Sequence, residues 1–119
     1  MTKPASALLL TCNTHLVEID LPFGTDSSAE RRAVLRAVLR CDYFDVVALT
    51  HRWDMWIDDE GQSRHPVNPA ATALAQRFGF THQRYHGPVL FTGGPDEEGN
   101  TLPLLREQLT GLLLTLQDL

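Results

Sequence analysis

The sequence predicts an α+β domain: a mostly antiparallel sheet of about five strands in two layers, with helices packed chiefly on one face. Short apolar runs and longer amphipathic stretches follow one another in the order ββαββαβα. Residues 16–21 alternate polar and apolar side chains, which is typical of a sheet with one face in water. The chain of 119 residues has room for one hydrophobic core, so we expect residues 1–119 to form a single domain.

The first half of the chain predicts a hairpin and a helix. Residues 7–12 and 16–21 are rich in leucine and β-branched residues, and residues 13–15 form the turn between them. Residues 27–30 read Ser-Ser-Ala-Glu, a capping box that starts a helix running to about residue 41. Its predicted buried stripe consists of Val34, Leu35, Val38 and Leu39. Arginines recur every four residues on its other face, which is either solvated or in contact with an anion; they are Arg32, Arg36 and Arg40.

The second half predicts three further strands and two helices. Residues 43–50 and 53–58 have strand character, and residues 59–62 form an acidic turn. Asn68 is a good N-cap before Pro69, so we expect a helix from there to Phe78, ended by Gly79. The wholly apolar residues 88–92 predict a central strand. Thr101 is expected to cap the last helix, whose packing stripe is Leu102, Leu105, Leu109, Leu112, Leu113 and Leu116.

Composition excludes several classes of protein. Hydrophobic residues make up 43% and charged residues 21%, which rules out a disordered tail or a fibre. A net charge of −5 makes binding to nucleic acid an unfavoured function. No apolar run approaches the roughly 20 residues of a membrane span. The two cysteines, Cys12 and Cys41, lack a C-x-x-C spacing, so we expect a reduced, cytoplasmic protein.

Candidate chemical groups are few, and each has a simpler structural explanation. His82 and His86 have a spacing that could hold zinc on a helix, but on a strand they would lie about 13 Å apart. The carboxylates of residues 54 and 58–60 could act as acid and base, although a polar hairpin tip explains them better. Residues 92–95, Thr-Gly-Gly-Pro, precede an acidic run that would repel phosphate. We therefore predict no catalytic residue, cofactor or metal.

Three segments resemble a known family. Residues 54–61 read D-M-W-I-D-D-E-G, residues 67–74 read V-N-P-A-A-T-A-L, and residues 87–99 read G-P-V-L-F-T-G-G-P-D-E-E-G. Their order resembles an uncharacterised small-domain family of phages, plasmids and integrated elements, with the signature N-E-E-G … N-P-x-A-T-A-L … T-G-G-P-D-x-E-G. The resemblance covers residues 43–101. It implies a compact cytoplasmic domain and supplies no activity, cofactor or catalytic residue.

The favoured function is that of a non-enzymatic accessory protein acting through protein–protein contact with an unknown partner. One alternative is an acidic inhibitor or nucleic-acid mimic of a host enzyme, and a second is a small metal-dependent hydrolase. Two glycine-bearing acidic segments are predicted to lie close together and to form one interaction surface. Their residues are Asp58, Asp59, Glu60, Gly93, Gly94, Asp96, Glu97 and Glu98.

A homodimer is also predicted. Leu104 and Leu114 fall outside the packing stripe of the last helix, and a small domain has little further core to cover them. Symmetric pairing would bury both leucines, because each chain would bring the same patch to the interface. The alternative is that the N-terminal hairpin covers this side of the helix or that the leucines are tolerated in water.

Overall fold

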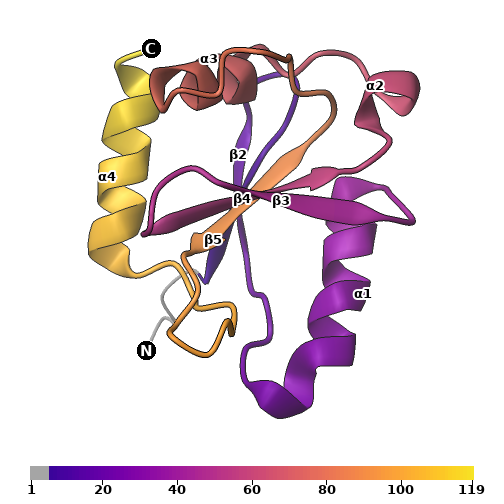
Figure 1. Cartoon of the computed structure of the whole chain (residues 1–119), viewed down its shortest axis with the longest axis vertical. Coiled ribbons are helices and arrows are strands. Elements are labelled where there is room, and N and C mark those ends of the chain that lie inside the picture. The colour runs from indigo at the N-terminus through magenta and orange to yellow at the C-terminus, as the bar shows by residue number, and fades with distance from the viewer. Residues whose placement is uncertain (1–5) are drawn as a thin grey trace.

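A five-stranded sheet forms the centre of the computed structural model, which describes residues 6–119 (Figure 1). The strands are β1 (Ala7–Leu10), β2 (Leu16–Ile19), β3 (Phe44–Ala48), β4 (Trp53–Asp58) and β5 (Val89–Gly93). Their order in the sheet is β2-β1-β5-β4-β3, and every neighbouring pair is antiparallel. The predicted fold class and the central position of β5 are confirmed.

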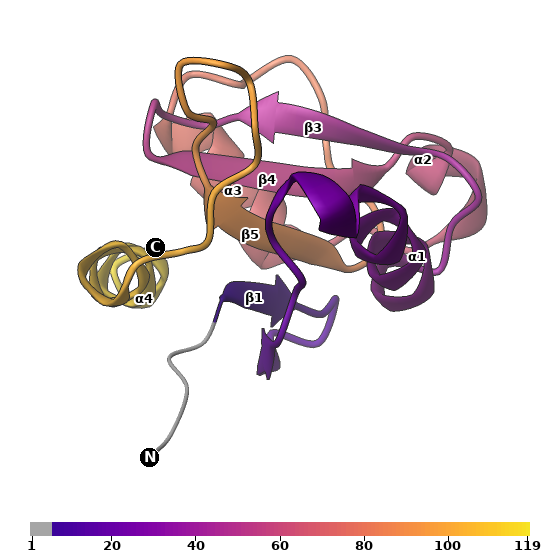
Figure 2. The same cartoon turned by 90° about the horizontal axis from the view of Figure 1, so that it is seen from below.

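The helices lie on both faces of this sheet (Figures 1 and 2). A 3-10 turn, η1 (Thr25–Ser27), leads into α1 (Ser28–Leu39), which covers one face. On the other face lie α3 (Pro69–Arg77) and α4 (Arg106–Gln117), and a short helix, α2 (Gly61–Arg64), follows β4. Two of the three longer helices thus share a face as expected, but α1 adds a third layer. The turn predicted over residues 59–62 is present at residues 59–60, but residues 61–64 form the helix α2.

The central strands are apolar on both sides, which explains why both faces are covered. Leu90 and Trp56 lie in the cluster under α1, together with Leu35 and Leu39 of that helix. Phe91 and Met55 belong to the opposite cluster, which α3 and α4 cover. A strand that is apolar on both sides has to be covered on both faces of the sheet. Because β5 is such a strand, helices pack on both faces, and the arrangement has three layers where two were expected. Within the described residues, no helix is long and apolar enough to cross a membrane.

Asn68 connects α3 to the sheet. Its side-chain oxygen accepts a hydrogen bond from the Ala71 amide at 3.1 Å, which confirms the predicted N-cap. Its side-chain nitrogen donates to the carbonyl oxygens of Leu10 and Gly87, at 3.1 and 3.0 Å. Since Asn68 is fully buried, this one side chain satisfies three backbone groups that water cannot reach.

The last helix begins at Arg106, five residues later than the predicted cap at Thr101. The preceding segment runs alongside the sheet: the Gly93 amide donates to the Leu102 carbonyl at 3.1 Å, and the Leu104 amide to the Ser6 carbonyl at 2.9 Å. Leu104 is consequently a core residue with 2% exposure. Its predicted place on a dimer surface is wrong, because an extended backbone turns its side chain into the sheet's core instead of outward from a helix.

Candidate functional site

The two acidic segments lie at opposite ends of the sheet. Trp53, the first residue of β4, pairs with Gly93, the last residue of β5. Asp58 is at the other end of β4, about 17 Å away along the strand. The prediction of one acidic surface is therefore wrong. The antiparallel pairing of β4 with β5 is the reason, because it separates the points where the two strands end.

The glycines of these segments allow close approach between backbones. A Cβ atom on Gly93 would lie 2.6 Å from the Pro103 carbonyl oxygen, and one on Gly61 would lie 2.8 Å from that of His86. On Gly94 it would overlap the carbonyl group of His51. A side chain at any of the three positions would push two backbone segments apart. Gly93 and Gly94 thus have a packing role.

Asp58 is enclosed, and its contacts hold α2 against the sheet. Its carboxylate accepts a hydrogen bond from the Glu60 amide at 2.8 Å and lies 2.9 Å from Nε2 of His65. The Arg64 guanidinium lies 3.8 Å from the same oxygen as His65. Burial, followed by the charge of Asp58, raises the pKa of the Cys41 thiol to about 11. A protonated thiol is a poor nucleophile, so this cluster has no activated cysteine.

The other acidic residues differ in environment. Hydrogen bonds from Asn100, first from its backbone amide, lower the pKa of the Asp96 carboxyl and close the loop on itself. Asp59, Glu60, Glu97 and Glu98 are exposed. Asp54 is buried, and burial raises the pKa of its carboxyl.

The two histidines considered as zinc ligands are not grouped with further ligands. His82 is exposed in the loop before β5, whereas Nδ1 of His86 lies 3.0 Å from the His65 carbonyl oxygen. Across residues 6–119, no group of three His, Cys, Asp or Glu side chains could hold a metal ion.

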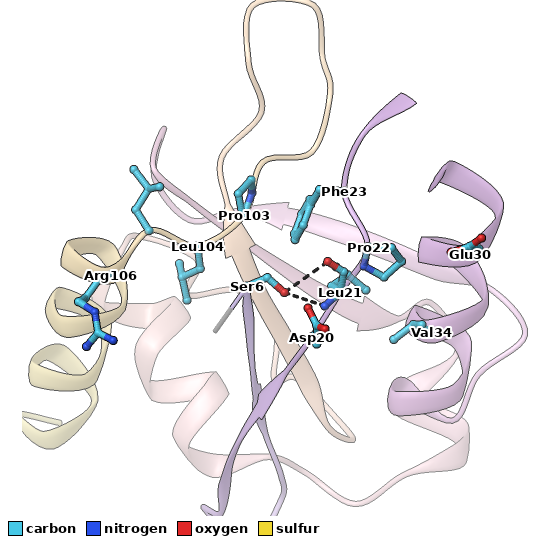
Figure 3. Close-up of a pocket in the computed structure, with 11 residues that line it drawn as sticks. Ser6, Asp20, Leu21, Pro22, Phe23, Glu30, Val34, Pro103, Leu104 and Arg106 are labelled. Carbon is cyan, nitrogen blue, oxygen red and sulfur yellow. Dashed lines mark hydrogen bonds between the residues drawn. The ribbon is translucent and has the colours of Figure 1, made fainter. Parts of the chain in front are cut away.

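A large hollow lies between α1 and the segment that leads into α4 (Figure 3). We call it the α1–α4 groove. It has a volume of about 940 Å³, and its apolar lining includes Leu21, Phe23, Val34 and Leu104. Ser6 joins its two sides: its carbonyl oxygen accepts from the Leu104 amide, and its hydroxyl accepts from the Leu21 amide at 2.7 Å. These backbone contacts fix the spacing of the walls, so the groove is formed before any ligand arrives.

Leu105 stands at the end of this groove, 53% exposed. It also lines two neighbouring hollows of about 660 and 580 Å³. Leu105 is the N-cap of α4, a position that favours Ser, Thr, Asp or Asn because their side chains accept a helix amide. A leucine cannot do so, although its own amide donates to the Gln108 side chain at 2.9 Å. Neither burial nor capping explains a leucine at this position.

Charged residues on the two walls of the groove have opposite signs. Asp20 follows β2 and Glu30 lies in the first turn of α1, whereas Arg106 begins α4 on the other wall. None of these three residues belongs to the ion pairs formed within residues 6–119. The neighbouring guanidinium of Arg31 instead donates to the carbonyl oxygens of Pro22 and Gly24, each at 3.3 Å.

Sequence reasoning missed the groove because it placed Leu105 within the packing stripe of a helix that began too early. The sequence feature that could have indicated the later start of the last helix is Pro103. A proline disfavours helical geometry in the residue before it and is best tolerated in the first turn of a helix. A helix start beyond Pro103 would have placed Leu105 at its N-terminus.

Fold and site together define a small α+β domain with a preformed, mainly apolar groove bordered by charged residues. The chain belongs to the family described as a domain of unknown function, DUF3846, which it matches over residues 8–117. This confirms membership of an uncharacterised small-domain family. No curated protein matches the chain, and no solved structure matches it.

Replacing Leu105 with aspartate is expected to stabilise the protein. An aspartate at the N-cap can accept a helix amide and interacts favourably with the helix dipole, which together contribute about 1 kcal/mol. The free energy of unfolding from urea titration measures this gain. The matched control is Leu114→Asp near the other end of α4, where the same substitution should lower stability because the dipole has the opposite sign. A loss of stability in Leu105→Asp would show that Leu105 packs structurally.

Proposed function

We propose that the chain is a non-enzymatic accessory protein, of the type carried by phages, plasmids and integrated elements, that acts in the cytoplasm by binding another protein. The binding surface is the α1–α4 groove. The observation that carries this proposal is Leu105, a half-exposed leucine at an N-cap position beside a preformed hollow. A large apolar side chain that stabilises neither helix nor core is typical of a contact surface.

The layout of the groove supports protein contact. Apolar side chains line it, and charged residues stand at its borders, the arrangement found in many protein–protein interfaces. Its hydrogen-bonded floor lowers the cost of binding, because little backbone has to be ordered when a partner arrives. The acidic residues named from the sequence remain candidates for further contacts, now as two separate surfaces.

The alternative functions receive less support. A nucleic-acid mimic needs carboxylates spread along an elongated face, but the molecule measures 34 × 31 × 29 Å and its acidic segments are at opposite ends. A hydrolase needs a reactive group that substrate can reach. Asp58 and Cys41 are buried, and the thiol of Cys41 is protonated at neutral pH.

Self-association through α4 is a second candidate function. Leu114 is 61% exposed, but it follows Leu105 by nine residues and so lies on a different side of the helix, away from the groove. Leu104, the other leucine predicted at the dimer interface, is buried in the core and is not available for this contact. Sedimentation of the wild type at tens of micromolar tests the homodimer, with Leu105→Asp and Leu114→Glu as interface variants. A monomeric wild type ends this candidate.

A peptide selection tests the binding function directly. The immobilised protein is screened with displayed random peptides of about 12 residues, which reach across the molecule when extended. We expect selected peptides to shift the amide NMR signals of residues around the groove and to lose most of their affinity for Leu105→Asp. Peptides that bind Leu105→Asp as well as the wild type, or that perturb only residues elsewhere, contradict the proposal.

A further inference from the structure

We propose that the α1–α4 groove recognises a partner segment that carries a large apolar side chain with a lysine or arginine beside it, oriented toward α1. This inference rests on the proposed function and adds the chemistry of the partner. Its basis is the distribution of charge around the groove.

The wall formed by β2 and α1 is acidic. Asp20 and Glu30 both line the groove, both are exposed, and neither takes part in an ion pair within the described part of the chain. The Arg31 guanidinium donates to the carbonyl oxygens of Pro22 and Gly24 and keeps its positive charge, so Asp20, Glu30 and Arg31 together give this wall one net negative charge. A cation of the partner is the group that complements this charge.

The opposite wall has the opposite charge. Arg106 is the first residue of α4, where the positive end of the helix dipole adds to its guanidinium charge. A partner segment is thus oriented by its charges: a basic residue lies at the α1 side, and an acidic or neutral residue lies at the α4 side. A reversed segment would place like charges together on both walls, which disfavours it.

The apolar side chain is required by the lining between these walls. Leu21 and Leu104 form fully buried parts of it, and Phe23 and Val34 are half-buried. A leucine or an aromatic residue in the hollow would cover the exposed parts of Phe23, Val34 and Leu105. Affinity is then supplied mainly by the apolar anchor, while the charges set orientation and selectivity.

Charge reversal tests the inference. The peptides selected on the wild type are synthesised with a fluorescent label, and binding is followed by anisotropy. For the double variant Asp20→Lys/Glu30→Lys we expect about tenfold weaker binding of the selected peptides at low salt, with a smaller effect as salt rises from about 0.05 to 0.5 M. Exchanging the peptide's basic residue for glutamate should restore its affinity for this variant.

The matched control is Asp42→Lys/Asp45→Lys, which makes the same change in net charge before and within β3, at the edge of the sheet opposite β2. It should alter binding by less than about twofold. All four positions are exposed, and thermal unfolding of each variant confirms that it folds.

Two results would overturn the inference: selected peptides without an enriched lysine or arginine, or equal effects of the two double variants. If Leu105→Asp still abolishes binding in that case, the proposed function stands without this partner chemistry. If Leu105→Asp has no effect either, both fail.

Discussion

Asn68→Ala is expected to lower the free energy of unfolding by about 3–5 kcal/mol, among the largest effects of any single substitution in this protein. The variant loses the side-chain acceptor that caps α3 and the side-chain donor to the buried carbonyl oxygens of Leu10 and Gly87. Removing one partner of a buried hydrogen bond costs about 1–3 kcal/mol, and the lost cap costs about 1 kcal/mol. Urea titration followed by circular dichroism measures the change.

Two companion variants identify the cause of this loss. Asn68→Asp retains the acceptor for the Ala71 amide but loses both donors, so its destabilisation should persist. Asn13→Ala, in the exposed turn between β1 and β2, should change stability by less than about 0.5 kcal/mol. A loss below about 1 kcal/mol in Asn68→Ala would contradict the role assigned to this side chain.

Leu104→Ala is expected to cost about 2–5 kcal/mol of stability, whereas Leu114→Ala should cost less than about 0.5 kcal/mol. The two leucines have the same chemistry and opposite environments, at 2% and 61% exposure. Truncating the first removes buried methyl groups and leaves a cavity in the core beneath α4. Truncating the second exposes no buried surface, and alanine is a slightly better helix former.

Thermal unfolding of the wild type and the two variants over a range of protein concentrations distinguishes these cases. If Leu104 were an interface residue, the melting temperature of Leu104→Ala would fall mainly at low protein concentration, because dimer stability depends on concentration. A fall that is independent of concentration is the result expected for a core residue. Equal stabilities of the two variants would contradict the burial of Leu104.

The elements that the sequence predicted best carry strong local signals. β4 occupies residues 53–58 as expected, because its apolar alternation is bounded by polar turns. Asn68 and Pro69 determine the start of α3, and the apolar run before Gly93 makes β5 central. In each case neighbouring residues are sufficient to specify the element.

The errors involve partners that are distant along the chain. Asp54 and Asp58 are buried on the face of β4 that also carries Trp56, and Asp58 is enclosed by His65 and Arg64, which local periodicity cannot show. Leu104 is buried because its backbone pairs with Ser6, almost a hundred positions earlier. The groove has the same origin, since its walls come from both ends of the chain.

The residues that hold the backbone together and those that border the groove belong to separate sets. Asn68 and the closely packed Gly61, Gly93 and Gly94 stabilise the arrangement of the backbone. The groove residues Asp20, Glu30, Leu105 and Arg106 are exposed, and their side chains make few contacts that stabilise the fold. Substitutions at these four positions should therefore cost little stability. Under the proposed function, surface mutation would then change the specificity of the groove without loss of the fold, and the domain would offer a compact scaffold on which binders with chosen targets could be selected.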